Sequence, residues 1–385
     1  MKVGIVTLRP EFELSGEYVS TVQLINHLKI NKIECSMLSP DSSRPKENNM
    51  EYSKTGDVVF GKIFSMVLFL FRLRWSSKEY DILHIYLPTP AFSIIADIVK
   101  FGIKTPLIVF YESSIVDRPL SLFRYFFKDF PFYVTRMLIN NRFVARLSLF
   151  KADKYVVSTK YQKQQLLSLG IESKKISLCF NISKSFNYKN IDRESARKAL
   201  NLQNRLYVCY IGNFLHLKGL ESLIKSFTDV VKEIPDSTLI LAYSGIGSKK
   251  RIDYLLQRDG LEKKTIILGK VDVGLLLSAS DVFVLPYLHG FGTNLIPNLV
   301  LEALSVNIPL ISSLVPPIKE VIMNRKEGIL VDPNDHKSLA SEIIRLLKDK
   351  NLADTIRSNQ RRKYEECFVP ENLVKRYIEL YEEFK

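Results

Sequence analysis

Short apolar runs alternate with amphipathic stretches along almost all of this 385-residue chain. In the first half the apolar runs are KVGIVTL, IECSML, YDILHIYLP and PLIVFYES. Runs of this length that are rich in β-branched residues predict buried strands, and the stretches between them repeat apolar positions at helical spacing. Because strands and helices alternate, the pattern predicts a parallel, doubly wound sheet of the α/β class.

The same alternation restarts after a polar and charged segment at residues 182–203, which we interpret as a linker. The second series contains the runs RLYVCYIG, STLILAYSG, TIILGK, DVFVLPY, PLISS and GILVDP. A chain of this length is too long for one ordinary core and suits two domains of roughly 150–200 residues. We therefore predict two Rossmann-like domains that face each other across a cleft, residues 1–190 and 191–365, followed by a final helix over 366–385.

A strand, a Gly-rich loop, a helix and a second strand are predicted over Asp281–Ile322. The helical stretch NLVLEALS carries a single acid, Glu302, among apolar residues. A lone carboxylate in the first turns of a helix at the mouth of a parallel sheet is well placed to bind a ribose. The start of such a helix also offers N–H groups to phosphate. The ordinary alternative is a solvated carboxylate on the helix surface.

A phosphate-binding loop is predicted in the stretch YIGNFLHLKGLESLI. Gly212 permits a tight turn at the end of a strand, and Lys218 places a positive charge where a pyrophosphate would meet the start of the next helix. Loops between a strand and a helix often contain Gly and an exposed Lys, so this signal alone is weak. The presence of both features in the same half of the chain strengthens each of them.

The net charge of +14 is concentrated in part of the first half. Residues 58–165 hold 16 Lys and Arg against 7 Asp and Glu, a net charge of +9, interleaved with Phe and Tyr. Three interpretations stay open: a buried amphipathic helix with snorkelling bases, an anionic membrane surface, or nucleic acid. The apolar run Ile63–Phe71 is about nine residues long, too short to span a bilayer.

Several function classes are disfavoured by what the sequence lacks. The four cysteines are scattered, which predicts reduced thiols in a cytoplasmic protein, and no His, Cys and Asp spacing suits a metal. The first residues, MKVGIVTLRP, predict a strand rather than a signal peptide. Neither a Gly-x-Ser-x-Gly elbow nor a Walker A lysine motif is present, which argues against esterases and P-loop enzymes.

Residues 200–365 resemble the donor-nucleotide domain of the retaining GT-B glycosyltransferases, the group with an acid–seven residues–acid motif. The matching stretches include YIGNFLHLKGLESLIKSF, LILAYSGIG, SASDVFVLPY, LVLEALSVNIPLISS and GILVDPNDHKSLASEIIRLL. The first half resembles the family more loosely, through KVGIVT, SGEYVSTVQLINHL and KADKYVVSTKYQKQQLLSLGI. The final helix resembles the family's C-terminal segment, which crosses back onto the first domain.

The resemblance implies a role for several residues of this chain. Lys218 would bind the donor diphosphate and Glu302 the ribose of the nucleotide. Gly16 would lie in an N-terminal loop that faces the diphosphate, and Gly245 and Gly247 near the base. The family needs no metal or other cofactor, so none is expected beyond the nucleotide-diphosphate sugar itself.

The chain departs from the family's pattern at several positions. Asn213 occupies a slot where an Arg is usual, and the first acid of the motif falls on Asn294, eight positions before Glu302. Asn can bind a sugar hydroxyl but supplies no charge, so we expect Thr293 and Asn294, or His289 and Thr293, to contact the donor sugar. Glu112 follows the strand PLIVFY where many members carry His, and it is a candidate acid/base or hydrogen-bonding group. The alternative is an acid that pairs with Arg118 or caps the next turn.

The remaining histidines suggest ordinary structural roles. His84 lies within a predicted core strand, and a lone strand histidine is more often a satisfied core residue than a catalyst. His216 lies in the predicted phosphate loop, where we expect an exposed side chain, with contact to the donor as the alternative.

The resemblance implies a retaining, metal-independent sugar transferase that uses a nucleotide-diphosphate sugar. A lipid-linked, diphosphate-bearing glycan as acceptor would explain the charge and aromatic content of residues 58–165, at the inner face of a membrane. The alternatives are a sugar-phosphate synthase or epimerase of the same fold, and a degenerate, non-catalytic sugar- or nucleotide-binding subunit. Nucleic acid is not expected as a partner, because no recognised binding module is present.

Overall fold

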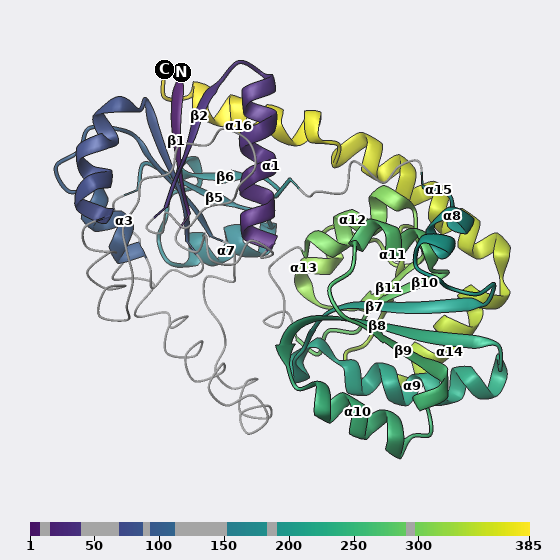
Figure 1. Ribbon diagram of the computed structural model, residues 1–385. Coiled ribbons are helices and arrows are strands. Elements are labelled where there is room, and N and C mark those ends of the chain that lie inside the picture. The colour runs from purple at the N-terminus through teal and green to yellow at the C-terminus, as the bar shows by residue number, and fades with distance from the viewer. Residues whose placement is uncertain (8–15, 40–68, 88–92, 112–151, 183–190, 290–296) are drawn as a thin grey trace. The chain divides into compact units, whose positions relative to one another are not determined.

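The computed structural model describes residues 1–7, 16–39, 69–87, 93–111, 152–182, 191–289 and 297–385. These residues form two compact units (Figure 1). The first unit takes in the described residues from 1 to 182 together with the last segment, 370–385. Of the described residues, 191–289 and 297–369 belong to the second unit. Among the described residues, the first unit is therefore built from two separate parts of the chain and the second from one part.

The first unit contains a parallel six-stranded sheet in the order β2-β1-β3-β4-β5-β6. Apolar side chains fill its strands, and β3 and β4 are buried along their whole length, as expected for a sheet covered on both faces. The strands are β1 (Lys2–Thr7), β2 (Glu34–Leu38), β3 (Ile82–Leu87), β4 (Leu107–Tyr111), β5 (Lys154–Val157) and β6 (Ile176–Leu178).

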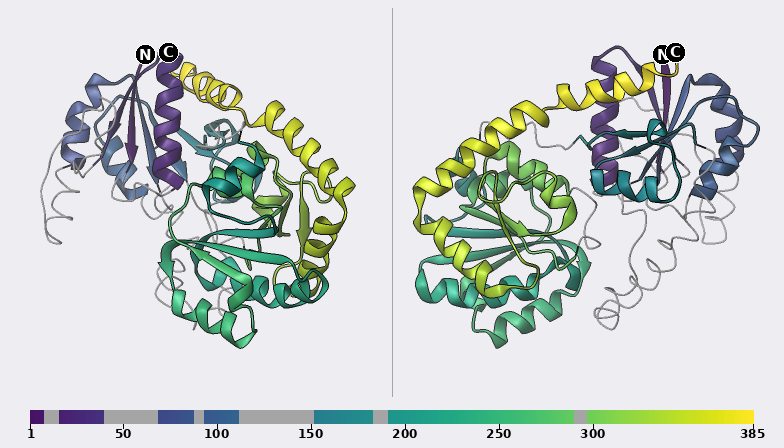
Figure 2. Two further views of the ribbon diagram at one scale, coloured as in Figure 1. Left: turned by 45° about the vertical axis from the view of Figure 1, so that its right-hand side comes forward. Right: turned by 180° about the vertical axis from the view of Figure 1, so that it is seen from behind.

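Helices from both ends of the chain pack on this first sheet. The helix α16 lies against α1, and the two chain termini lie close together (Figures 1 and 2). Residues 69–76 are helical as well. The other helical elements are α1 (Gly16–Ile30), α3 (Ser93–Lys100), α7 (Lys160–Ser168), α16 (Pro370–Glu382), and the 3-10 turns η1 (Ser77–Glu79) and η4 (Ser173–Lys175).

An aromatic cluster holds α16 on the first sheet. His84 of β3 is fully buried, as the sequence predicts, and its Nδ1 forms a 2.7 Å hydrogen bond with the hydroxyl of Tyr381. The His84 ring stacks on Tyr86 at 4.9 Å and lies 6.0 Å from the ring of Tyr377. Burial lowers the pKa of His84 to about 3, so the imidazole is neutral at neutral pH.

The second unit contains another parallel six-stranded sheet, in the order β12-β11-β10-β7-β8-β9. The chain starts at β7, adds β8 and β9 on one side, and then crosses to add β10 on the other side of β7. The two sheets confirm the predicted doubly wound α/β class. The strands are β7 (Leu206–Phe214), β8 (Ser237–Gly247), β9 (Thr265–Leu268), β10 (Val282–Leu285), β11 (Leu310–Ser313) and β12 (Ile329–Val331).

Helices cover both faces of the second sheet (Figure 1). The helices α9, α10 and α14 form one layer, and α8, α11, α12 and α15 form the other. Their bounds are α8 (Arg193–Ala199), α9 (Leu220–Glu233), α10 (Lys249–Arg258), α11 (Val273–Ala279), α12 (Asn298–Val306), α13 (Pro316–Lys319), α14 (His336–Lys348) and α15 (Lys350–Cys367), with 3-10 turns η6 (His216–Lys218) and η7 (Glu262–Lys264).

A buried carboxylate fixes α8 to the start of β10. Asp281 accepts hydrogen bonds from Arg193 at 2.7 Å, from Arg197 at 2.9 Å and from the backbone N–H of Tyr207 at 2.7 Å. Its side chain is 10% exposed, so these three donors replace most of its hydration. The first residues of the second unit are thereby joined to the middle of its sheet.

Cys35, Cys179 and Cys209 are buried, Cys367 is half-buried, and all four are free thiols, as predicted. Burial raises the pKa of the Cys209 thiol to about 12, which makes it unreactive at neutral pH. Among the described helices, none is long and apolar enough to cross a membrane.

Candidate functional site

The carboxyl ends of β7 and β10 form the point where the second sheet reverses its strand order. The two strands are neighbours, with Val208 opposite Val282 and Cys209 opposite Phe283. In open α/β sheets, ligands bind at the carboxyl ends of the strands, at such a reversal. The loops that follow β7 and β10 are therefore the place to look for a site, and both predicted signals lie on the segments that follow these strands.

The loop after β7 is held tightly against the end of β10. Gly219 adopts φ +74°, and a Cβ built on it would lie 1.7 Å from the carbonyl oxygen of Pro286. The backbone N–H of Leu288 donates to the carbonyl of Leu217 at 3.0 Å. No other residue type than Gly fits this approach, because any side chain would overlap backbone atoms and would be strained at this φ.

Lys218 immediately precedes this glycine. Its Nζ lies over the ring of Tyr287, 4.8 Å from the ring centroid, and Tyr287 is 2% exposed. The negative face of an aromatic ring attracts an ammonium group, so the ring restricts where the flexible lysine stem can point. Lys218 is therefore fixed at the start of α9. In the described part of the chain no side chain caps that end of the helix.

Glu221 lies three residues after Lys218 in the sequence, and its negative charge is paired. Glu221, in the first turn of α9, accepts a hydrogen bond from His216 Nδ1 at 3.1 Å and forms an ion pair with Arg251. The His216 side chain is only 9% exposed, so the expectation of an exposed loop histidine was wrong: Glu221 holds the ring against α9. Pairing with Arg251 offsets the negative charge that Glu221 would otherwise place beside a diphosphate.

Glu302 lies in α12, which follows β10. The residue is 8% exposed, unlike a solvated helix carboxylate, and sits one turn after the helix begins at Asn298. His289, just beyond the end of β10, has its pKa lowered by burial, so its imidazole is neutral at pH 7. A carboxylate and a neutral imidazole, which here both follow β10 in the chain, can bind hydroxyl groups of a polar ligand.

The predicted glycines of the second unit lie near the carboxyl ends of β7 and β8. Gly212 has φ +149°, and next to it the hydroxyl of Tyr210 donates to the carbonyl of Asn213 at 2.8 Å. Gly247 has φ +103° opposite Phe214, and a Cβ there would lie 2.3 Å from the Phe214 carbonyl oxygen. Gly245, with φ +98° and open space around it, keeps the backbone accessible.

The structure places six of the predicted residues in β7 and β8 or on the segments that follow β7 and β10. They are Gly212, Asn213, Lys218, Gly245, Gly247 and Glu302. Gly16 is the first residue of α1, in the first unit. The other predicted residues, Glu112, Thr293 and Asn294, lie outside the described residues.

Three residues on the segments that follow β7, β8 and β10 were missed from the sequence. Gly219 follows Lys218 directly, and a Gly at the start of a helix is a signal that could have identified it. Tyr287 and Arg251 gave no such signal, because each acts through a residue far away in the chain: Tyr287 on Lys218, and Arg251 on Glu221.

Comparisons with known proteins agree with this geometry. Residues 192–363 match the family model described as glycosyl transferases group 1. An uncharacterised glycosyltransferase of Methanocaldococcus jannaschii is 24% identical over 242 residues, 62% of this chain and 60% of that protein. The Escherichia coli UDP-Gal:alpha-D-GlcNAc-diphosphoundecaprenol alpha-1,3-galactosyltransferase is 34% identical over 146 residues, 37% of this chain and 35% of the relative.

Both matches thus span less than two thirds of the relatives' own length, whereas the structural likeness extends over the whole chain. Anabaena HepE, solved in complex with UDP-glucose, superimposes with a TM-score of 0.77 at 16% identity, covering 100% of both chains. The two parallel sheets and this whole-chain likeness show that the chain has the GT-B fold, and its residues 192–363 are similar to the group 1 glycosyl transferases.

Proposed function

We propose that this glycosyltransferase moves a sugar from a nucleotide-diphosphate sugar to an acceptor hydroxyl with retention of the anomeric configuration. The observation that carries the proposal is the edge formed by β7 and β10, where a fixed lysine precedes an uncapped helix start and a buried carboxylate follows on α12. A cation with helix N–H groups suits a diphosphate, and a carboxylate suits the two hydroxyls of a ribose. The UDP-glucose bound to Anabaena HepE, a protein of the same fold, supports the same ligand class.

The chemistry assigned to these residues is mainly electrostatic. The bond between the anomeric carbon and the diphosphate oxygen breaks, and its electron pair leaves with the diphosphate. Lys218 and the first N–H groups of α9 stabilise that charge, which is worth several kcal/mol when the groups are fixed in advance. The acceptor oxygen bonds to the anomeric carbon from the same face, and its proton passes to the departing phosphate oxygen. No metal is required in this scheme.

Glu302 orients the donor rather than reacting with it. Its carboxylate accepts hydrogen bonds from the ribose hydroxyls and thereby sets the distance between the diphosphate and Lys218. Because Glu302 is 8% exposed, its hydrogen bonds to the donor form with little competition from water. Asn213 adds an amide beside the diphosphate but no charge, so Lys218 is the main phosphate cation in this scheme.

We further propose that the acceptor is a lipid-linked glycan at the inner face of a membrane. The support is the charge of +9 over residues 58–165, interleaved with aromatic residues, and a relative whose name contains a diphosphoundecaprenol acceptor. Flotation with anionic liposomes tests this, comparing the wild type with a variant in which the Arg and Lys residues of 118–146 are replaced by Gln. Equal flotation of both proteins would contradict the proposal.

Isothermal titration calorimetry with a panel of uridine and guanosine diphosphate sugars tests the donor site. Lys218→Ala and Glu302→Ala should each weaken donor binding about 10- to 100-fold, as expected for the loss of a charged hydrogen bond. Lys225→Ala, an exposed lysine of α9, and Glu262→Ala, an exposed acid, serve as controls and should bind normally. Failure of the wild type to bind any of these sugars would overturn the proposal.

A binding protein without catalysis is the second candidate. It is favoured by Asn213 and Asn294, which stand where the family carries an Arg and an acid. Such a protein would bind the donor normally but would release no nucleotide in the presence of any acceptor alcohol. Measuring nucleotide release with and without acceptor separates the two. An epimerase would convert the nucleotide sugar into its epimer without an acceptor and without net release of the nucleotide.

A further inference from the structure

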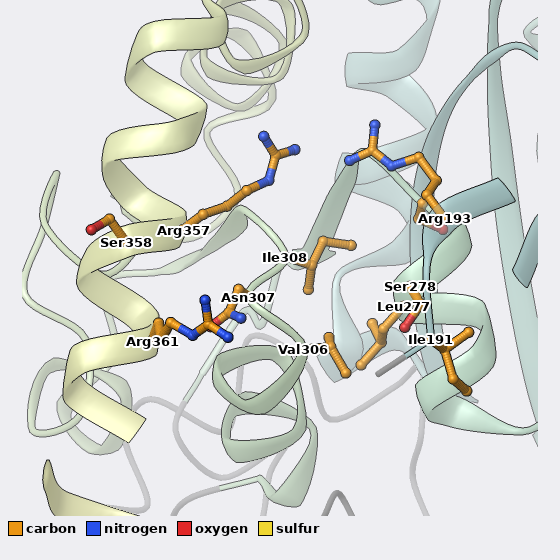
Figure 3. A pocket seen from close by; sticks show the side chains of 11 residues that line it. Ile191, Arg193, Leu277, Ser278, Val306, Asn307, Ile308, Arg357, Ser358 and Arg361 are labelled. Carbon is orange, nitrogen blue, oxygen red and sulfur yellow. The ribbon is translucent and has the colours of Figure 1, made fainter. Parts of the chain in front are cut away.

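A pocket of about 440 Å³ opens in the second unit, away from the donor edge (Figure 3). Its lining residues Ser280 and Ile308 lie two positions before the starts of β10 and β11, so the pocket lies at the amino ends of strands whose carboxyl ends face the donor loops. The lining comes from α8, α11, α12 and α15 and consists of Ile191, Arg193, Leu277, Ser278, Ser280, Val306, Asn307, Ile308, Arg357, Ser358 and Arg361.

Positive charge dominates this pocket. Its lining includes the guanidinium groups of Arg193, Arg357 and Arg361 and contains neither Asp nor Glu. Figure 3 shows Arg193 and Arg357 extending toward each other from opposite walls. Guanidinium groups repel one another unless an anion lies between them, and their planar N–H forks match the oxygens of a phosphate.

These arginines already have partners, but some of their guanidinium N–H groups remain available to a ligand. Arg193 donates through Nη1 to Asp281, which Arg197 already neutralises. Arg357 pairs with Asp354, whose side chain is 69% exposed, and Arg361 pairs with Glu365, which is 52% exposed. Exposed ion pairs of this kind contribute little, so a ligand can displace them at small cost. A guanidinium also has five N–H donors, more than these contacts use.

Arg193 is influenced both by its burial and by the charges around it. Burial lowers the pKa of Arg193, and the neighbouring charges of Arg357 and Arg197 lower it further, against the opposing influence of Asp281. An anion bound in the pocket would offset part of the cost of burying this guanidinium.

The other wall of the pocket is apolar. Ile191, Leu277, Val306 and Ile308 contribute aliphatic side chains beside the arginines. Pockets for small molecules typically measure about 300–1,000 Å³ and combine an apolar wall with a few charged groups. We propose that this pocket is a second ligand site, which binds a small molecule consisting of a phosphate monoester attached to an apolar group.

Phenyl phosphate is a suitable probe, because it joins a phosphate to one apolar ring. Calorimetry on the full chain should show that it binds, that inorganic phosphate binds more weakly, and that phenol, which lacks the charge, shows no heat of binding. The double variant Arg357→Gln/Arg361→Gln should weaken phenyl phosphate binding at least about 10-fold, because each lost guanidinium removes charged hydrogen bonds.

The matched control removes the same charge outside the pocket. Arg345→Gln/Arg362→Gln changes one arginine of α14 and one of α15, neither of which lines the pocket, and should bind phenyl phosphate like the wild type. Binding must also persist in Lys218→Ala, which separates this pocket from the donor edge. Equal weakening in both double variants, loss of binding in Lys218→Ala, or no binding to the wild type would each overturn the proposal.

Discussion

The two six-stranded sheets are built alike, yet each holds a distant chain segment by different chemistry. In the first sheet, neutral His84 meets the hydroxyl of Tyr381 inside an aromatic cluster and so fixes α16. In the second, the carboxylate of Asp281 binds Arg193 and Arg197 and so fixes α8. A helix is thus attached to the first sheet through uncharged groups and to the second sheet through charged groups.

Whether a helix is held by neutral or by ionic groups determines how strongly the loss of one group affects the stability of that unit. A neutral cluster loses one hydrogen bond when a partner is removed, and its rings stay packed. An ionic cluster leaves the remaining charges unpaired, and the penalty of an unpaired, partly buried charge exceeds the net contribution of the pair. We therefore expect the second unit to be more sensitive to a single substitution and the first to be more sensitive to acid.

The largest effect is expected for Asp281→Ala. It removes the acceptor of two guanidiniums and of the Tyr207 N–H, and should lower the free energy of unfolding of the second unit by about 3 kcal/mol. This is the lower end of the usual range because Arg193 is 43% exposed and can reach water. Hydrogen exchange with mass spectrometry measures the loss in peptides that cover β10.

Asp354→Ala is the control for that variant. Asp354 pairs with Arg357 on the surface, and its removal should cost less than about 1 kcal/mol. If Asp354→Ala and Asp281→Ala destabilise β10 equally, the buried ion pairs of Asp281 contribute no more to the stability of the second unit than an exposed pair does.

An intermediate effect is expected for the first unit in acid. His84 has a folded pKa of about 3 against an ordinary value of 6.5, so between these pH values only the unfolded chain takes up the proton. Stability is therefore constant above pH 6.5 and falls below it, by about 1.4 kcal/mol per pH unit, or roughly 2 kcal/mol at pH 5. Denaturant midpoints of hydrogen exchange in β3 peptides between pH 7.5 and 5 give the slope.

His84→Phe should remove this part of the slope, because phenylalanine fits an aromatic cluster and does not titrate. Peptides from β10 provide the internal reference in the same samples. A slope that is the same in His84→Phe and in the wild type would exclude His84 as its source.

The smallest effect is expected for Tyr381→Phe. The change deletes the hydroxyl that binds His84 Nδ1 but keeps the ring in place, and should cost about 1 kcal/mol in the first unit. Tyr254→Phe, on the exposed tyrosine of α10, is the matched control and should change nothing measurable. A cost above that of Asp281→Ala would reverse the comparison between the two sheets.

Much of this fold follows from local pattern. Continuous apolar runs such as DVFVLPY and YDILHIYLP are buried strands in the structure, because strands covered on both faces must be apolar throughout. The repeated strand–helix alternation also determines the parallel sheets. The fold class and the GT-B fold were therefore predicted correctly from the sequence.

The candidate site was predictable only in part. Lys218 and Glu302 lie near strand ends, where short motifs reveal them, and the structure places both on segments that follow adjacent strands. The ring of Tyr287 against Lys218, the ion pair of Arg251 with Glu221 and the arginine pocket join residues from separate elements. Such contacts depend on tertiary packing, which no local pattern records.

The discontinuous make-up of the first unit bears on how the chain folds as it is synthesised. Residues 191–369 are continuous, so the second unit has all its parts before the ribosome reaches the C-terminus. The first unit, although translated first, lacks α16 until residues 370–385 emerge. Until then the surface around His84 has no helix to cover it, so the earlier half of the protein is the later one to complete its fold.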